Sequence, residues 1–260
     1  MAYSRFEEER QFGMDQIEAL SKTAHRDLRV VRAKADAISA EQRMIPMVVS
    51  EFIKAAAAMP VLLTKNAANG RFLTVALCGF EEGENLFWRQ GGWDGLYVPL
   101  NVARHPFFLG APEGDGDYVL CLDASADCLS RAEGEALFDA DGAETAYLRR
   151  TQAALRQLAV GERETLAFID SLLEAGLLSD VALEITFANG EHCRMQGLYT
   201  IDEAKLDALP DAALLALRQK GYLPFIYAMI VSVAQIYALI ERKNAALAKA
   251  QQWFAAGGAG

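Results

Sequence analysis

Apolar and polar positions in the first half of the chain follow the pattern of antiparallel hairpins. The segment VLLTKNAANGRFLTVALCGF places two apolar runs on either side of Asn69-Gly70, and this dipeptide is the strongest short-range signal for a tight hairpin turn. The same design returns with strands expected near 106–110 and 117–123, around a turn rich in glycine, proline and aspartate. A third hairpin is expected over 181–199, where apolar and polar residues alternate. The pattern therefore predicts a sheet of four or more antiparallel strands.

Helical spacing replaces this alternation in the second half. Between Glu144 and Gly176, leucine and isoleucine recur at the intervals of a helix with one apolar face. A shorter helix is expected over Glu51–Met59, ended by Pro60. The sequence TIDE at Thr200–Glu203 has the form of a capping box that opens another. The predicted class is α+β, with antiparallel hairpins in the N-terminal half packed with a helix-rich C-terminal half.

One apolar stretch has two interpretations. Tyr222–Ile240 carries no charged residue over about the length of a membrane span. Pro224, Ser232 and Gln235 weaken its apolar character, and the sequence holds no second segment of this kind. A helix that is apolar on every side is also found at the centre of a large soluble core. The residues favour a buried core helix, with a membrane-attached segment as the alternative.

The two ends of the chain differ in composition from the middle. Residues 1–24 are polar and charged and predict a helical arm, whereas residues 253–260 are rich in alanine and glycine and predict a flexible tail. Residues 25–252 are expected to form a single domain, because a chain of this length can bury a substantial core.

Composition argues against one large class of function. The chain of 260 residues has a net charge of −10 and no run of lysine and arginine. A nucleic-acid partner, which needs a basic face, is therefore not expected. The cysteines fit no zinc-binding spacing. Because Cys78 and Cys121 lie inside apolar runs, buried thiols are favoured over disulfides. The first residues lack the apolar region of a signal peptide, and together with the thiols this predicts a cytoplasmic location. The four cysteines are Cys78, Cys121, Cys128 and Cys193.

The sequence contains no motif for catalysis or metal binding. His25, His105 and His192 are far apart, and no phosphate-binding loop or G-x-S-x-G is present. Neither a metal nor a cofactor is therefore expected, and no catalytic residue is assigned. An enzyme would need a site assembled from scattered groups such as Glu51, Arg104 and His105.

The segment ENLFWRQGGWDGLYVP, Glu84–Pro99, is the best candidate for a binding surface. Trp88 and Trp93 can be core residues beside a turn, because aromatic side chains bury large areas. They can also form an aromatic wall beside glycines that let a ligand backbone approach closely, with Arg89 and Arg104 at its flanks. The residues alone favour packing.

Several segments occur together in an order that resembles one protein family. MVVSEFIKAAAAMPVLL, ALCGFEEGENLFWRQGGWDGLYVPLNVARHPFFL, LCLD, LFDADG and GLYTIDEAKLDALPD resemble the SapC family, over residues 25–240. The family is named after a protein linked to bacterial surface-layer formation, and its members tend to be encoded beside outer-membrane receptors and cupin-like oxygenases. The resemblance carries over no catalytic residue. Positions that match as motif members only are Glu51, Pro60, Gly79, Asn85, Phe87, Trp93, Tyr97, Pro99, Pro106 and Phe107.

The resemblance moves the interpretation of Glu84–Pro99 towards a surface that both packs and binds. We expect Asn85 to fix the turn, and Trp93 and Tyr97 to line a partly exposed groove beside the first hairpin. The complete set of expected binding residues is Asn85, Phe87, Trp93, Tyr97 and Arg104.

The function that the resemblance implies is that of a SapC-like accessory protein. It would be non-enzymatic and would bind a peptide or protein partner in a surface-layer or outer-membrane-related pathway. The alternatives are an enzyme with an assembled site and a membrane-attached component of export. Neither the partner nor the oligomeric state follows from the sequence.

Overall fold

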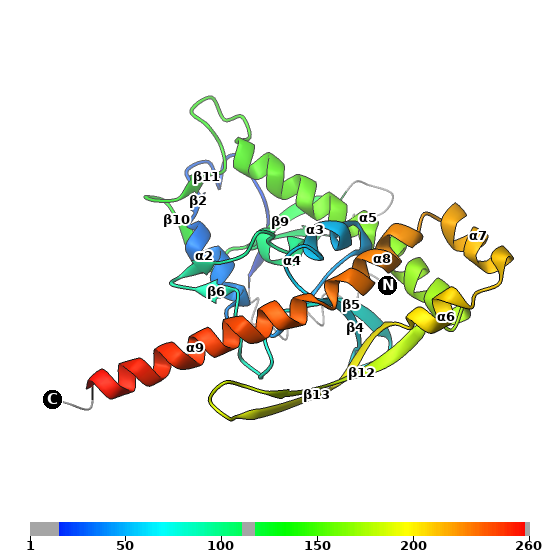
Figure 1. Ribbon diagram of the computed structural model, residues 1–260. Helices are drawn as coiled ribbons and strands as arrows, with labels where there is room; N and C mark the ends of the chain where they lie inside the picture. Colours follow the sequence, from blue (N-terminus) through cyan, green and yellow to red (C-terminus); the bar gives the residue numbers. More distant parts are fainter. Residues whose placement is uncertain (1–15, 111–117, 258–260) are drawn as a thin grey trace. The chain divides into compact units, whose positions relative to one another are not determined.

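The computed structural model describes residues 16–110 and 118–257, with side chains described as far as Trp253. It confirms the α+β class, with antiparallel sheets mostly in the N-terminal half and long helices in the C-terminal half (Figure 1). The chain divides into two compact units, which are described in turn. Unit 1 comprises residues up to Ile38, Gln90–Trp93 and Leu100–Ala159; unit 2 comprises Ser39–Arg89, Asp94–Pro99 and residues from Val160 onward. The domain limits expected at residues 25 and 252 stay predictions.

Unit 1 contains two small antiparallel sheets. The strand orders are β1-β9-β8 and β10-β2-β11. β8 and β9 form the hairpin expected near 106–110 and 117–123, with Phe107 opposite Leu122; residues 111–117 of its turn lie outside the described part. The strands are β1 (Ile17–Ala19), β2 (Arg29–Val30), β8 (Phe107–Gly110), β9 (Val119–Asp123), β10 (Leu129–Ser130) and β11 (Glu135–Ala136).

The core of unit 1 is one cluster of buried side chains from these sheets and from helix α5 (Ala146–Glu174). The helix confirms the periodicity seen over 144–176, and it turns Leu148 and Leu155 into the cluster. The division between the units falls within α5, after Ala159. The short helices are α2 (Arg32–Asp36), η1 (Ala37–Ser39) and α4 (Leu100–Ala103).

The helical arm predicted over residues 1–24 is not found where the structure describes that segment. Residues 1–15 lie outside the described residues. Ile17–Ala19 form strand β1, which pairs antiparallel with β9. Backbone pairing with a distant strand has overridden the local preference for a helix, which is a weak determinant of structure in so short a segment.

Unit 2 is built on a five-stranded antiparallel sheet with the order β12-β13-β4-β5-β3. Asn69-Gly70 lies between β4 and β5 as predicted, with Gly70 at φ +69°. The third predicted hairpin is β12–β13. The strands are β3 (Met44–Pro46), β4 (Val61–Lys65), β5 (Phe72–Leu77), β12 (Leu178–Thr186) and β13 (His192–Ile201).

Helices of unit 2 pack through aromatic contacts. Phe52 and Phe168 meet edge to face with ring centroids 5.9 Å apart, and Phe225 contacts both rings. Gly161 of α5 permits a close approach, because a Cβ atom there would lie 2.8 Å from the Cβ of Val48. The helices are η2 (Val49–Glu51), α3 (Phe52–Ala55), α6 (Glu203–Asp207), α7 (Asp211–Gln219), α8 (Leu223–Ser232) and α9 (Gln235–Gly257).

The capping box predicted at Thr200–Glu203 is wrong in its first residue. Thr200 still belongs to β13, where it pairs with Ser179. Asp202 is the N-cap of α6, and its carboxylate accepts the backbone N–H of Lys205 at 3.1 Å. The strand therefore continues two residues further than the local pattern indicates.

The single buried helix predicted over Tyr222–Ile240 is also wrong. Two helices, α8 and α9, meet at Val233-Ala234, and the Ser232 hydroxyl accepts the backbone N–H of Val61 in β4 at 2.9 Å. Leu223–Trp253 is long and apolar enough to cross a membrane, with an 18-residue window of mean hydropathy 2.0, of which 28% is buried. A core helix would be mostly buried, so this stretch packs on one side only.

Candidate functional site

The Glu84–Pro99 stretch begins with a turn that is held by its own polar side chains. Asn85 is buried; its amide donates to the carbonyl of Ser39 at 2.7 Å and accepts the N–H of Phe87 at 2.9 Å. A Cβ atom at Gly79 would lie 2.4 Å from the carbonyl oxygen of Glu84, so only glycine fits there. Asn85 therefore fixes the turn as expected, from a position inside the protein.

Phe87 is buried beneath helix α9. Its ring lies 4.5 Å from the guanidinium carbon of Arg242, at a distance typical of a cation–π contact. Arg242 also pairs with Asp94 at 3.0 Å, and Arg89 donates to the carbonyl of Arg242 at 3.0 Å. These contacts fasten the start of the stretch to the helix and leave the Phe87 ring no surface for a ligand.

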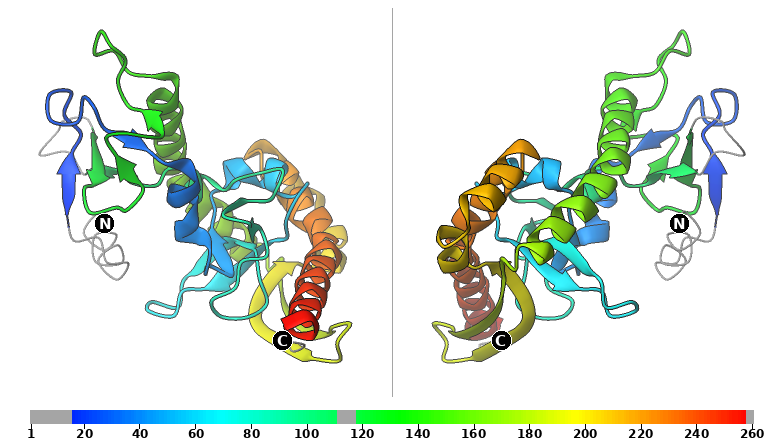
Figure 2. Two further views of the ribbon diagram at one scale, coloured as in Figure 1. Left: turned by 90° about the vertical axis from the view of Figure 1, so that its left-hand side faces the viewer. Right: turned by 90° about the vertical axis from the view of Figure 1, so that its right-hand side faces the viewer.

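Lys243, one residue further along α9, is buried in the same region. Its ammonium group contacts Glu84 at 2.7 Å and Glu81 at 3.1 Å, and it lies 5.6 Å from the centre of the Phe187 ring. Burial lowers the pKa of Lys243. The hydrogen bonds to Glu84 and Glu81 and their negative charges together have a larger, opposite effect, so the pKa is raised above its usual value. The lysine stays charged and joins the turn, the hairpin tip and α9. Figure 2 shows α9 (red) beside the β12–β13 hairpin (yellow).

Tyr97 closes the end of the stretch onto η2. Its hydroxyl donates to one carboxylate oxygen of Glu51 at 2.9 Å, and the other oxygen accepts the N–H of Val48 at 3.0 Å. Glu51 is fully buried. Burial and the neighbouring Glu51 carboxylate raise the pKa of Tyr97. Leu96, directly before it, is 92% exposed, so the loop presents an apolar tip while its tyrosine is held.

Trp93 and Arg104 belong to unit 1. Trp93 lies in β7 (Gly92–Trp93) and is half-buried, whereas Trp88 lies in β6 (Trp88–Arg89) in unit 2. Arg104 donates to the side chain of Asn101 and to the carbonyl of Phe107, both at 3.1 Å, and covers the Phe108 ring at 4.6 Å.

His105 is buried beside Arg104. Burial, and then the charge of Arg104, lower the pKa of His105 to about 4, against the opposing effect of Asp123 and Asp127. The imidazole is therefore neutral near pH 7.

The five expected binding residues fall into two groups. Asn85, Phe87 and Tyr97 are in unit 2, and Trp93 and Arg104 are in unit 1. Asn85 and Phe87 are buried supports of the turn, whereas the other three side chains are partly exposed. The groove shared by Trp93 and Tyr97 stays a prediction.

The four thiols are poorly suited to act as nucleophiles or metal ligands. All four cysteines are free, and burial raises the pKa of each, for Cys128 to about 12. A thiolate, which is the nucleophile and the metal ligand, is disfavoured at every one. Across residues 16–110 and 118–257, no group of three or more histidine, cysteine, aspartate or glutamate side chains could hold a metal ion.

Sequence reasoning missed the outer edge of the unit 2 sheet. β12 is nine residues long and pairs with β13 along one side only, as far as the described residues show. Its residues alternate: Val181, Leu183 and Ile185 are half-buried, whereas the intervening residues are exposed. The opposite edge, β3, is three residues long and ends in Pro46. The alternation over 181–186 predicts a strand, but it does not predict that this strand lies at the edge of the sheet, which follows from the strand order in the fold.

The sequence of the chain matches one known protein family. A profile of the SapC family matches residues 20–239, most of the 260-residue chain. The protein belongs to the SapC family. No curated protein and no solved structure matches it.

Proposed function

We propose that this SapC-family protein is a non-enzymatic accessory protein that binds an extended peptide segment of a protein partner as an added strand beside β12. The observation that carries the proposal is the open edge of β12, nine residues without a proline. Every second residue of an antiparallel edge strand directs its N–H and C=O groups outward. Natural proteins usually shorten or cover such an edge, because it attracts another strand.

The side chains of β12 define the chemistry of the peptide. A strand added in register extends the apolar face of Val181, Leu183 and Ile185 if its own residues alternate. The exposed face carries Asp180 and Glu184, and Glu184 already lies 3.4 Å from Arg194 across the hairpin. A segment that alternates apolar and basic residues therefore fits best, and the net charge of −10 favours its approach.

Two features support a binding role over catalysis. Both oxygens of the Glu51 carboxylate are engaged by Val48 and Tyr97. His105 is neutral and buried, and its low pKa makes it a weak base. The link to a surface-layer or outer-membrane-related pathway, and a cytoplasmic place for the protein, rest on the family and on the sequence.

The test uses a designed octapeptide of alternating valine and lysine, titrated calorimetrically into the full-length protein. A peptide of the same composition, with the valines grouped before the lysines, is the ligand control. We expect the alternating peptide to bind more tightly, and backbone amides over Leu178–Thr186 to gain protection from hydrogen exchange.

A proline at the edge should block the added strand. Ala182 lies at the register shift between Val181 and Leu183, where pairing with β13 is already interrupted. Ala182→Pro removes an N–H group and puts a ring in the path of the peptide, whereas Ala182→Ser keeps the N–H as the matched control. Equal binding by the proline and serine variants, or protection confined to another segment, would contradict the proposal.

A second candidate is attachment to a membrane surface through α8 and α9. The observation in its favour is the low burial of the apolar Leu223–Trp253 stretch. Tyr227, Val231 and Tyr237 are exposed on it, and exposed tyrosines beside aliphatic residues suit the boundary between lipid and water. Lys243 is bound to Glu84 and Glu81 within the protein, so attachment at the surface fits better than insertion of the whole stretch. Recovery of the expressed protein in the soluble fraction, without sedimentation on phosphatidylcholine vesicles, would exclude it.

A further inference from the structure

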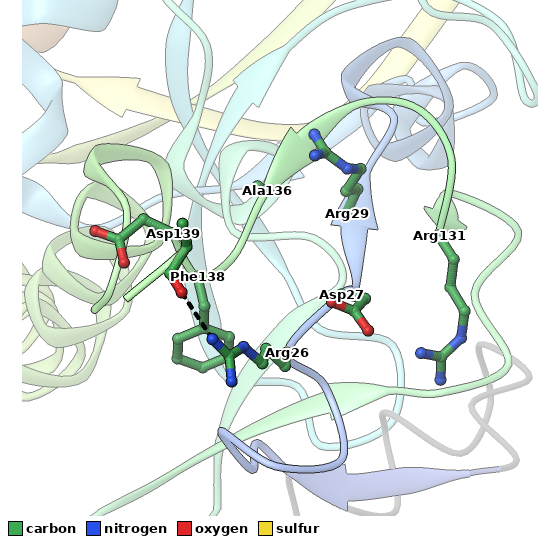
Figure 3. Close-up of a pocket in the computed structure, with 8 residues that line it drawn as sticks. Arg26, Asp27, Arg29, Arg131, Ala136, Phe138 and Asp139 are labelled. Carbon is green, nitrogen blue, oxygen red and sulfur yellow. Dashed lines mark hydrogen bonds between the residues drawn. The ribbon is translucent and has the colours of Figure 1, made fainter. Parts of the chain in front are cut away.

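Unit 1 contains a pocket of about 510 Å³ that is rich in arginine. Arg26 precedes strand β2, Arg29 lies within it, and Arg131 follows β10, which pairs with β2. Figure 3 shows these side chains around Asp27, with the Phe138 ring at one side. The small sheet β10-β2-β11 thus brings Arg131 near Arg26 and Arg29, which lie about a hundred residues earlier in the chain.

Backbone carbonyl groups hold two of the three guanidinium groups in place. Arg26 donates to the carbonyl of Ala140 at 2.7 Å, and Arg29 donates to that of Gly134 at 3.0 Å. Gly134 has φ +102°, and a Cβ atom there would lie 2.5 Å from the carbonyl oxygen of Val30. Only glycine allows the loop to lie this close to β2. Each contact uses one of five guanidinium N–H donors and neutralises no charge.

The acidic residues of the pocket, Asp27 and Asp139, offset only part of these charges. Asp139 is bound in its own turn, where one oxygen accepts the N–H groups of Asp141 at 3.0 Å and Ala143 at 2.8 Å. Asp27 is exposed. Among the residues that the structure describes, none of the three pocket arginines forms an ion pair with a carboxylate. In a chain with 35 acidic and 25 basic residues, three arginines gathered without such a partner are unexpected.

We propose that this pocket binds a small molecule with two or more negative charges, either a polycarboxylate or a phosphomonoester. Guanidinium groups bind carboxylate and phosphate oxygens through paired N–H donors. The pocket is larger than a single phosphate needs and lies in the size range of small-molecule sites. Arg131 comes from a different segment than Arg26 and Arg29, so a ligand with separated anionic groups can meet guanidinium groups of both segments. Asp27 opposes binding and keeps the affinity moderate.

The experiment is calorimetric titration of the full-length protein at low salt, with citrate in one arm and phosphoserine in the other. Binding of citrate alone assigns a polycarboxylate, and binding of phosphoserine alone assigns a phosphomonoester. We expect Arg131→Ala to raise the dissociation constant of the ligand about tenfold, as for the loss of one charge-assisted contact. Arg131→Lys should lose part of this, because it keeps the charge but not the paired donors.

Two further variants separate a site from a general effect of charge. Arg150→Ala removes an exposed arginine of α5 that does not line the pocket, and it should leave binding unchanged. Asp27→Asn should tighten binding severalfold by removing the opposing charge. The proposal is overturned if Arg150→Ala weakens binding as much as Arg131→Ala, if Asp27→Asn has no effect, or if neither anion binds at millimolar concentration.

Discussion

In two regions of unit 2, burial is the reverse of what the polarity of the residues suggests. In the turn around Asn85, polar side chains are enclosed: Asn85 and Lys243, which reaches the turn from α9, are buried, and Glu84 is half-buried. On the outer face of α8 and α9, Val231 is 66% exposed and Tyr237 is 76% exposed. Each polar side chain of this turn has a partner in the chain, and polar groups paired in this way are structural supports. The exposed apolar groups are the ones left for a partner of another kind.

The largest effect on this comparison should come from the buried ring of the turn. Phe87→Ala removes a ring that is 2% exposed and should lower the free energy of unfolding by about 3–5 kcal/mol. Trp93→Ala is the contrast within the same stretch. Because Trp93 is half-buried, we expect a loss of about 1–2 kcal/mol in stability and, if it lines a groove, about 2 kcal/mol in partner binding.

Urea denaturation of both variants, followed by tryptophan fluorescence and circular dichroism, measures the two losses. A Trp93→Ala loss as large as that of Phe87→Ala would show that Trp93 is a core residue. In that case the predicted groove has no aromatic anchor in unit 1.

The buried lysine should come next. Lys243→Ala leaves the half-buried Glu84 and the exposed Glu81 facing each other without their shared cation. Because water screens the Glu81 contact, the cost should be about 2 kcal/mol, less than for a fully buried pair. Lys249→Ala, an exposed lysine of the same helix, is the matched control and should change stability by about 0.5 kcal/mol or less. Equal urea midpoints for the two variants would show that the cluster does not stabilise unit 2.

Local features of the fold could be predicted from the sequence, because their determinants are close together along the chain. Asn69-Gly70 sets its hairpin through turn chemistry alone. The leucines between Glu144 and Gly176 define α5 through a repeat of one helical face. One of the two Asn85 hydrogen bonds, to the N–H of Phe87, reaches only two residues ahead.

The contacts that decide the candidate site are distant in sequence and could not be predicted in this way. Lys243 meets Glu84 across 159 positions, and Tyr97 meets Glu51 across 46. A single sequence gives no information on which charged residues become neighbours. The open edge of β12 depends in the same way on strand order, which the alternation of its residues does not specify.

Buried His105 predicts a dependence of stability on pH. Its pKa in the folded protein is about 4, below the ordinary 6.5, because of burial and Arg104. The unfolded chain therefore takes up a proton first as the pH falls. The stabilisation is present above pH 6.5 and is lost as the pH falls towards 4, with a decline of about 2 kcal/mol by pH 5. Urea denaturation at pH 7.5, 6 and 5 should show a decline that is reduced in His105→Gln. An equal decline in both proteins would assign the loss to other groups.

The smallest effect on stability should come from the exposed apolar face. Val231→Gln and Tyr237→Gln replace side chains that are mostly in water with a residue of good helix propensity, so unfolding should change by about 0.5 kcal/mol or less. Ile226→Gln, at a fully buried position of α8, is the contrast and should cost several times more, because it buries an amide without a partner. If α8 and α9 attach to a membrane surface, the two exposed variants should sediment less with phosphatidylcholine vesicles, although they are as stable as the natural chain. Unchanged sedimentation would remove this face from the second candidate function, and a large loss of stability would show that the face packs within the protein.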